Sequence, residues 1–473
     1  MADLQDELQA AGEAGELDPP PTTRTKAKPK RGHHPPVAEP IAPGDADRAD
    51  ADRPDGSRTG ADRPGGSRTD GDRAAAVGHA EGSRAAGTSP ASPASPASAA
   101  DASGTSGPGG ERPEAGTVRV RAAEASGAET VVAGTAEPSS ELAEAHAFLV
   151  AHPVADGYSG LPSVLRQLPR YDLELGEGGV DTDVPRMRKG HIGALFWSLH
   201  LPEGLTGEQA VGATLEQLDL VRTVVHAHPE GLRLVHSAGE TTDARNCGRV
   251  AVLLGPAGAP AIGDSLGILR ALHALGLKAL TLAAASWAGE SGLSRFGEEV
   301  VREMNRIGVL ADLSGASEPT FRRALAVSRA PALCTRSAAG ALRPHPANLP
   351  DDLLAALGEA RGLCMVPLTA EQTGPSVHDV ADHLDHVRAI AGPECVGLSG
   401  TYDSGAAHPQ DLTDASCYPR LVAELMHRGW SEPDLALLTW GNVQRVLRTA
   451  DFTARAAKDR RDASTARIAE LDG

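Results

Sequence analysis

The side chains that could do chemistry in this chain stand where buried strands are predicted to end. The residues following six such strands read GPAGA (255–259), AAASW (283–287), SGASE (314–318), TRSAA (335–339), PLTAE (367–371) and GTYDS (400–404). Together they supply one Arg, two Glu and one Asp, without any His or Cys. A hydrolase needs a metal ligand set or a nucleophile with a neighbouring base. These segments provide neither, and their main positive charge is Arg336.

One group of histidines elsewhere has a spacing that could suggest a ligand set. His378, Asp382 and His386 repeat every four residues on a predicted helix, and His383 lies three residues before His386. Side chains four residues apart share one face of a helix. Because this helix lies away from the strand ends, we interpret the group as a solvated helix face rather than a metal site.

Two further histidines flank a predicted strand. His191 precedes it and His200 lies near its carboxyl end, which leaves His200 as the remaining histidine to consider for catalysis. Tyr158 and Tyr402 also fall near strand ends. We interpret both tyrosines as packing residues that fill space rather than as nucleophiles.

The elements that must position these residues alternate regularly between 137 and 455. Short apolar runs predict strands at VADGY (154–158), HIGALFWSLH (191–200), VAVLLG (250–255), KALTLAAA (278–285), VLADLS (309–314), PALCT (331–335), GLCMVPL (362–368) and CVGLSGT (395–401). Amphipathic segments predict helices over 263–276, 297–308, 317–328, 350–360 and 377–392. Strands alternating with helices through short loops imply parallel pairing, and eight such strands close an α/β (β/α)8 TIM barrel. An open doubly wound sheet is the alternative, but GPAGAPAIGDS (255–265) lacks the GxGxxG order of a dinucleotide turn.

Residues 1–136 cannot form a core of their own. No aromatic Phe, Trp or Tyr precedes Phe148, and no Leu lies between Leu17 and Leu142. The decapeptide ADRPDGSRTG (51–60) is followed by a near copy, and SPASPASPAS (89–98) is a Pro, Ser and Ala spacer. We therefore predict a long disordered N-terminal tail over 1–136, a folded domain over 137–455 and a short C-terminal tail over 456–473.

The composition of the chain indicates which binding partners and which cellular compartment to expect. The net charge of −18 opposes nucleic-acid binding, so the basic segment RTKAKPKR (24–31) is interpreted as a solvated charge run. No run of eighteen apolar residues and no signal-like N-terminus is present, which predicts a cytoplasmic protein with neither nucleic acid nor a membrane as partner. The five cysteines lack CxxC pairing, which suits reduced thiols and argues against structural zinc.

Several stretches of the domain resemble the membrane (renal) dipeptidases. They include HPVADGYSGLP (152–162), TDVPRMRKGHIGALFWSLHLP (182–202), FGEEVVREMNRIGVLADLS (296–314) and YPRLVAELMHRGWSEPDLALLTWGNVQRVLR (418–448). The resemblance implies a (β/α)8 barrel that hydrolyses dipeptides through two zinc ions. It spans nearly all of 137–455.

The same resemblance implies that the metal ligands have been replaced. The family's His-x-Asp on the opening strand corresponds to Tyr158 and Gly160, its bridging glutamate to Ala257, and its two later metal histidines to Gly315 and Arg336. Two polar groups near the substrate are also replaced, and they correspond to Ala284 and Thr401. Side chains such as these do not bind zinc, so the resemblance predicts no metal cofactor here.

Loss of the metals would remove most of the family's catalytic power. A zinc ion lowers the pKa of its bound water from about 15.7 to about 7, equivalent to about 12 kcal/mol. A stray general base, worth about 10²–10⁴-fold, cannot replace this contribution. We therefore predict a non-catalytic homologue, a pseudoenzyme with a binding or regulatory role. The alternative is a dipeptidase with a non-standard metal site.

The partners expected of such a homologue follow from the resemblance and from Arg336. Dimers are typical of the family, which predicts a homodimer or a heterodimer with an active paralogue. Arg336 could fill part of the vacated metal volume near Asp403, bind a small anionic ligand bidentately, or point to solvent. The sequence leaves these three possibilities open.

Overall fold

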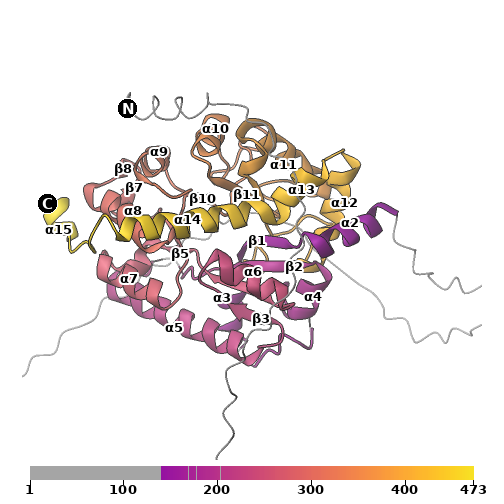
Figure 1. The fold of residues 1–473 in the computed structure, drawn as a ribbon, viewed down its shortest axis with the longest axis horizontal. Helices are drawn as coiled ribbons and strands as arrows, with labels where there is room; N and C mark the ends of the chain where they lie inside the picture. Colours follow the sequence, from indigo (N-terminus) through magenta and orange to yellow (C-terminus); the bar gives the residue numbers. More distant parts are fainter. Residues whose placement is uncertain (1–139, 169, 177, 203) are drawn as a thin grey trace, which may run out of the picture. The chain divides into compact units, whose positions relative to one another are not determined.

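The computed structural model describes residues 140–168, 170–176, 178–202 and 204–473. The tail predicted over 1–136 lies outside the described residues. Within them the chain forms a curled parallel sheet surrounded by helices, as Figure 1 shows. The prediction of an α/β barrel is confirmed. No helix of the described ranges is both long and apolar enough to cross a bilayer.

The sheet consists of ten strands, and all of its ladders are parallel. Their order is β3 (Leu232–Leu234), β4 (Val250–Leu254), β2 (Ile192–Trp197), β1 (Val154–Ser159), β12 (Val396–Ser399), β11 (Leu363–Pro367), β10 (Leu333–Cys334), β9 (Leu310–Asp312), β6 (Ala279–Thr281) and β5 (Ala257–Gly258). The last strand in this order, β5, follows β4 in the chain after Gly255 and Pro256. A further parallel bridge joins Leu254 to Leu277. The two ends of the sheet therefore return to each other, as closure of a barrel requires.

Helices cover the outside of the sheet. They are α2 (Ser140–Ala151), α3 (Leu161–Leu165), α4 (Val184–Lys189), α5 (Gly207–Ala227), α6 (Ala238–Asn246), α7 (Leu266–Ala274), α8 (Arg295–Ile307), α9 (Glu318–Val327), α10 (Asp351–Glu359), α11 (Val377–Ala391), α12 (Tyr418–His427), α13 (Glu432–Ala436), α14 (Asn442–Lys458) and α15 (Ile468–Leu471). In Figure 1 the yellow helix α14 runs across one side of the domain. The five helices predicted from amphipathic segments correspond to α7 through α11.

Local sequence signals explain where these helices begin and end. The Ser294 hydroxyl accepts a hydrogen bond from the Gly297 amide at the start of α8, and Gly308, at φ +84°, ends that helix. At the start of α11, Ser376 and Asp379 form a reciprocal capping box. Each helix then turns an apolar stripe toward the sheet, such as Val300, Val301 and Met304 of α8.

Several parts of the structure differ from the prediction, including the following. The strand predicted over 278–285 ends at Thr281, and Ala284 adopts left-handed backbone at φ +57°, which no strand can contain. Between 201 and 249 the structure contains α5, β3 and α6, which the sequence did not predict. The proposed boundary at 455 falls inside α14.

The segment after α14 packs on the barrel wall. Asp472 accepts hydrogen bonds from the Ser294 hydroxyl and the Phe296 amide, and the Ser464 carbonyl accepts one from Arg270. Ile468 and Leu471 contact the core cluster. This segment therefore adds contacts to α7 and α8 rather than to the strand ends.

Candidate functional site

Two hollows lie at the carboxyl ends of the strands, and Ser314 and Arg336 line both. The larger hollow has a volume of about 410 Å³ and is also lined by residues that follow β2, β5 and β6. The second hollow, of about 310 Å³, extends toward Glu371 and His345. In a parallel barrel this end of the sheet carries the functional residues. We therefore treat these hollows together as the barrel mouth.

Arg336 is fixed between these hollows by its neighbours. Its guanidinium carbon lies 4.4 Å from the ring centroid of Tyr158, which is a cation–π arrangement. The Arg336 amide donates to the Ser314 hydroxyl, and its carbonyl accepts from the Gln372 amide group. The side chain forms no ion pair with any described residue, and its buried Nε has no hydrogen-bond partner among them.

His200 lines the larger hollow together with Arg336. Burial lowers its pKa to about 4, the positive charge of Arg336 adds to that effect, and Asp312 opposes it. The Nδ1 atom of His200 lies 2.8 Å from the Ser198 hydroxyl and Nε2 lies 3.4 Å from the Thr281 hydroxyl. Since the Thr281 hydroxyl donates to Asp312, it can only accept from His200. The neutral ring therefore carries its proton on Nε2, facing the hollow.

A fully buried carboxylate, Asp312, organises the floor of the mouth. One of its oxygens accepts hydrogen bonds from the Thr335 amide and hydroxyl and from the Ser314 hydroxyl, at 2.9, 3.1 and 2.8 Å. Its other oxygen accepts from Thr281 at 2.7 Å. These donors satisfy the carboxylate, so Asp312 acts as a brace that aims Thr281 and Ser314. Sequence reasoning missed it because it lies inside an apolar strand.

Two more buried carboxyls flank the β1 side of the mouth. Burial raises the pKa of Asp156 to about 6, although the Tyr158 and Gly400 amides donate to it. Burial also raises the pKa of Asp403 to about 6, against hydrogen bonds from the Thr182 hydroxyl and the Asp181 amide. Asp403 is thus engaged by Thr182 and Asp181. Of the three possibilities left open for Arg336, a place beside Asp403 is not supported by any hydrogen bond or ion pair between these two described residues.

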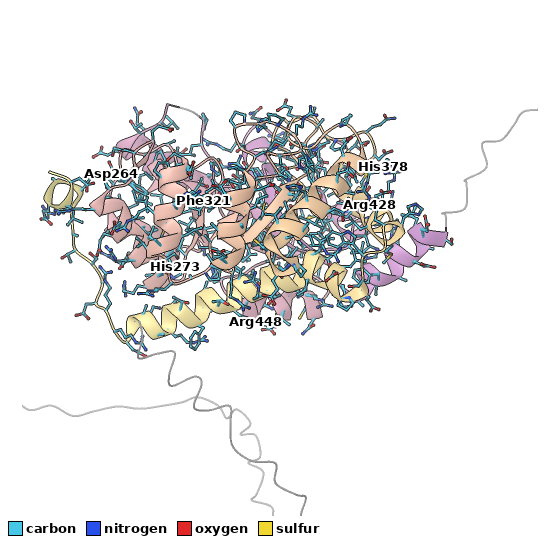
Figure 2. All side chains as sticks on the ribbon, turned by 90° about the horizontal axis from the view of Figure 1, so that it is seen from above. Asp264, His273, Phe321, His378, Arg428 and Arg448 are labelled. Atoms are coloured by element: carbon cyan, nitrogen blue, oxygen red, sulfur yellow. The ribbon has the colours of Figure 1, made fainter. Side chains whose placement is uncertain are left out.

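Three members of the predicted histidine group, His378, Asp382 and His386, make their contacts on outer helices rather than at the barrel mouth. His378 contacts Glu424, Asp382 pairs with Arg428, and His386 bonds to Asp351, all on outer helices. Figure 2 shows His378 and Arg428 together on one flank of the domain. The solvated-face interpretation fits these residues. It is wrong for His383, which is 2% exposed and accepts a hydrogen bond from the Ala339 amide.

His383 should make the fold sensitive to acid. Burial lowers the pKa of His383 to about 4, whereas in the unfolded chain it is near 6.5. The unfolded state therefore binds its proton first as the pH falls, and the stability contributed by neutral His383, complete above pH 6.5, is lost toward pH 4. Between pH 7 and pH 5 this loss amounts to about 2 kcal/mol.

Urea unfolding at both pH values would measure this effect. The variant His383→Gln keeps an acceptor for Ala339 but cannot titrate, so the stability difference from wild type should shift in its favour at pH 5. Comparing variant and wild type at each pH cancels the titration of all other groups. His378→Gln, on the exposed face of the same helix, is the control. An equal acid response in wild type and His383→Gln would contradict the prediction.

Comparison with known proteins decides the family. Residues 142–461 match the family described as Membrane dipeptidase (Peptidase family M19). The chain belongs to this family. Its resemblance to the membrane dipeptidases, expected from the sequence, is confirmed.

Relatives within the membrane dipeptidase family cover most of the folded domain. Dipeptidase 3 of Macaca fascicularis is 38% identical over 343 residues, which are 67% of this chain and 69% of the relative. Dipeptidase verJ of Clonostachys rogersoniana is 30% identical over 358 residues, 70% of this chain and 92% of the relative. A metallopeptidase structure from Rhodobacter sphaeroides, liganded with a phosphinate mimic of L-Ala-D-Ala, is 26% identical with a TM-score of 0.59, covering 63% of this chain and 99% of that one.

The positions that the resemblance assigns to the membrane dipeptidase metals do not fit a two-metal centre in this structure. A Cβ on Gly160 would lie 2.2 Å from the Asp403 carbonyl oxygen, so no side chain fits there as the backbone stands. Ala257 is buried, Gly315 offers no donor, and Arg336 places a cation at the mouth. Across the described ranges, no three His, Cys, Asp or Glu side chains are grouped so that they could hold a metal ion.

The two positions assigned to substrate contacts have an unusual backbone. Ala284 and Thr401 adopt positive φ angles of 57° and 54°, and Asp403 does so at 57°. Left-handed backbone is unfavourable for a residue with a Cβ, and for β-branched Thr401 it is an outlier. Such strain concentrates at functional sites. The backbone at the mouth is therefore strained at both positions, which carry Ala and Thr side chains.

Proposed function

We propose that this chain is a member of the membrane dipeptidase family that does not hydrolyse dipeptides and instead binds a ligand at the barrel mouth. The observation that carries the proposal is the donor set at that mouth. Tyr158 and Arg336 stack on each other there, and Gly160 is closed to any side chain by the Asp403 backbone. A guanidinium repels divalent cations and cannot coordinate them.

The remaining polar groups do not compose another hydrolytic centre. Both oxygens of Asp312 are already occupied by hydroxyl and amide donors. His200 is paired with Ser198 and Thr281, and the Thr281 hydroxyl donates to Asp312 rather than to His200. The hollow itself is well formed, at about 410 Å³, within the range of about 300–1,000 Å³ typical of small-molecule sites. A well-formed pocket that lacks the residues for hydrolysis supports a ligand-binding role.

Metal analysis combined with a hydrolysis assay tests this proposal. We expect the purified full-length chain, incubated with excess zinc and then dialysed, to retain less than one zinc ion per chain. We also expect no cleavage of L-Ala-D-Ala or of a panel of dipeptides. The Rhodobacter sphaeroides metallopeptidase serves as the assay control, since its structure holds a mimic of that dipeptide. Stoichiometric zinc together with turnover that a chelator abolishes would overturn the proposal in favour of a non-standard dipeptidase.

A further inference from the structure

The larger hollow has a distinct division of polar and apolar walls. Its apolar side is formed by Leu201, Pro202, Leu205, Pro260 and Ala261. Its polar side presents the groups of His200, Thr281, Ser314 and Arg336. No Asp or Glu contributes to the lining among the described residues. Among the described residues, the lining therefore combines one full positive charge with an apolar wall and includes no carboxylate.

The guanidinium of Arg336 is prepared for an anion. Its guanidinium carbon lies 4.4 Å from the centroid of the Tyr158 ring. The Arg336 backbone is held as well, since its amide donates to the Ser314 hydroxyl and its carbonyl accepts from the Gln372 amide group. Its Nε is buried without a partner among the described residues. A carboxylate forms strong charge-assisted hydrogen bonds with a guanidinium, and the described lining of this hollow supplies none. The site therefore favours an anion as its ligand.

His200 adds no second charge to the hollow. It stays neutral because burial and Arg336 lower its pKa, and its Nε2 proton is donated to the Thr281 hydroxyl. A single anionic head group therefore pairs with the guanidinium of Arg336 alone. A second negative charge would meet no second cation in this lining.

We infer that this hollow binds a small organic monoanion, namely a monocarboxylate with a short apolar tail and without a charged amino group. This inference rests on the proposed function, because it requires the mouth to be free of metal ions. The carboxylate pairs with Arg336, and the tail packs on the Leu201, Leu205 and Ala261 wall. An ammonium group finds no partner in the described lining, because no Asp or Glu contributes to it and the buried Asp312 already accepts from Thr281, Ser314 and Thr335.

The second hollow indicates on which side of Arg336 the anionic head group binds. On its other side Arg336 faces a lining that includes the exposed carboxylate of Glu371. An anion placed there would meet a like charge. The lining on the His200 side includes no Asp or Glu among the described residues, so the head group is assigned to the larger hollow.

Calorimetric titration of the full chain with hexanoate and with L-norleucine tests the inference. The two probes share a six-carbon skeleton and a carboxylate, and norleucine adds only the ammonium group. We expect hexanoate to bind in the millimolar range or tighter and norleucine to bind at least tenfold more weakly. Hexylamine, which reverses the charge, should not bind. Equal affinity for hexanoate and norleucine would overturn the charge selectivity, and the lack of any hexanoate binding would overturn the site.

Variants of Arg336 locate the binding. Arg336→Gln should weaken hexanoate binding at least tenfold, whereas Arg329→Gln, which removes the same charge before β10 instead of after it, should leave it unchanged. Unchanged affinity in Arg336→Gln, with an unfolding midpoint near that of wild type, would overturn the assignment.

Failure of the inference can be told apart from failure of the proposed function. Zinc-dependent turnover would refute the proposed function, whatever the hexanoate titration shows. A zinc-free, inactive chain that ignores hexanoate, or that binds it equally well as Arg336→Gln, would leave the proposed function standing and refute the ligand class.

Discussion

Gly160→Ala should destabilise the fold by about 3 kcal/mol or more. A Cβ at this position would lie 2.2 Å from the Asp403 carbonyl oxygen and 2.8 Å from its carbonyl carbon, and both are backbone atoms that cannot swing away. The backbone on each side is also held, since the Gly160 amide donates to the Tyr402 carbonyl at 2.8 Å. Relief of the clash therefore requires β1 and the segment after β12 to separate. Chemical denaturation of the variant and wild type would measure the loss.

Gly315→Ala is the matched control for this prediction. Gly315 lies at another predicted ligand position, and a Cβ there would meet no atom within 4 Å. Its φ of +71° means that Ala carries only backbone strain, about 1–2 kcal/mol. A Gly160→Ala cost no larger than that of Gly315→Ala would show that the two segments give way easily, and the close contact would then not define the mouth.

This contrast bears on how the mouth differs from that of a metal-binding barrel. Gly160→Asp would introduce the carboxylate that the resemblance expects at this position, yet the side chain has no room. We expect the substitution to cost at least as much stability as Gly160→Ala and to confer no zinc binding. Restoring ligands one at a time should therefore fail. In this structure the Asp403 backbone occupies the space that a side chain at position 160 would need.

The elements predicted correctly share a strong local signal. The runs that form β4 and β11 are uniformly apolar and fully buried, and α8 has a wide apolar stripe with a serine cap and a terminal glycine. By contrast, β3 has only three residues, and α5 mixes Gly, Thr and Val with charged residues, so neither stands out in isolation. Packing against the sheet stabilises these elements, and such packing is not visible in a local window.

The candidate site was predictable in its residues but not in its contacts. Arg336 stood out because it was the single basic residue at the quoted strand ends. Its stacking on Tyr158 joins residues that are far apart in the chain, and only the closure of the barrel brings them together. Asp312 had a usable signal: a carboxylate inside an apolar strand must be satisfied by hydrogen bonds if it is buried. The same reasoning would have identified Asp156 in β1.

Asp451→Ala should cost about 3–5 kcal/mol because it leaves a buried ammonium without its counter-charge. Lys278 is 2% exposed, and its Nζ lies 2.8 Å from one carboxylate oxygen of Asp451 on α14. The other oxygen accepts from the Ala238 amide at the start of α6. A double-mutant cycle with Lys278→Met separates these losses, since Asp451→Ala should cost much less once the ammonium is absent. Equal costs in both backgrounds would contradict a buried ion pair.

The position of the Lys278–Asp451 pair predicts that its loss lowers the stability of the fold without changing ligand binding at the mouth. Lys278 precedes β6 and so lies at the amino end of that strand, whereas Thr281 at its carboxyl end lines the larger hollow. In barrels of this class the amino ends serve stability and the carboxyl ends serve function. Native Asp451→Ala, studied below its lowered unfolding temperature, should therefore bind hexanoate within about twofold of wild type, a difference of about 0.4 kcal/mol. A tenfold loss of affinity would mean that the two ends of β6 are coupled, and that the mouth depends on the α14 contact for its shape.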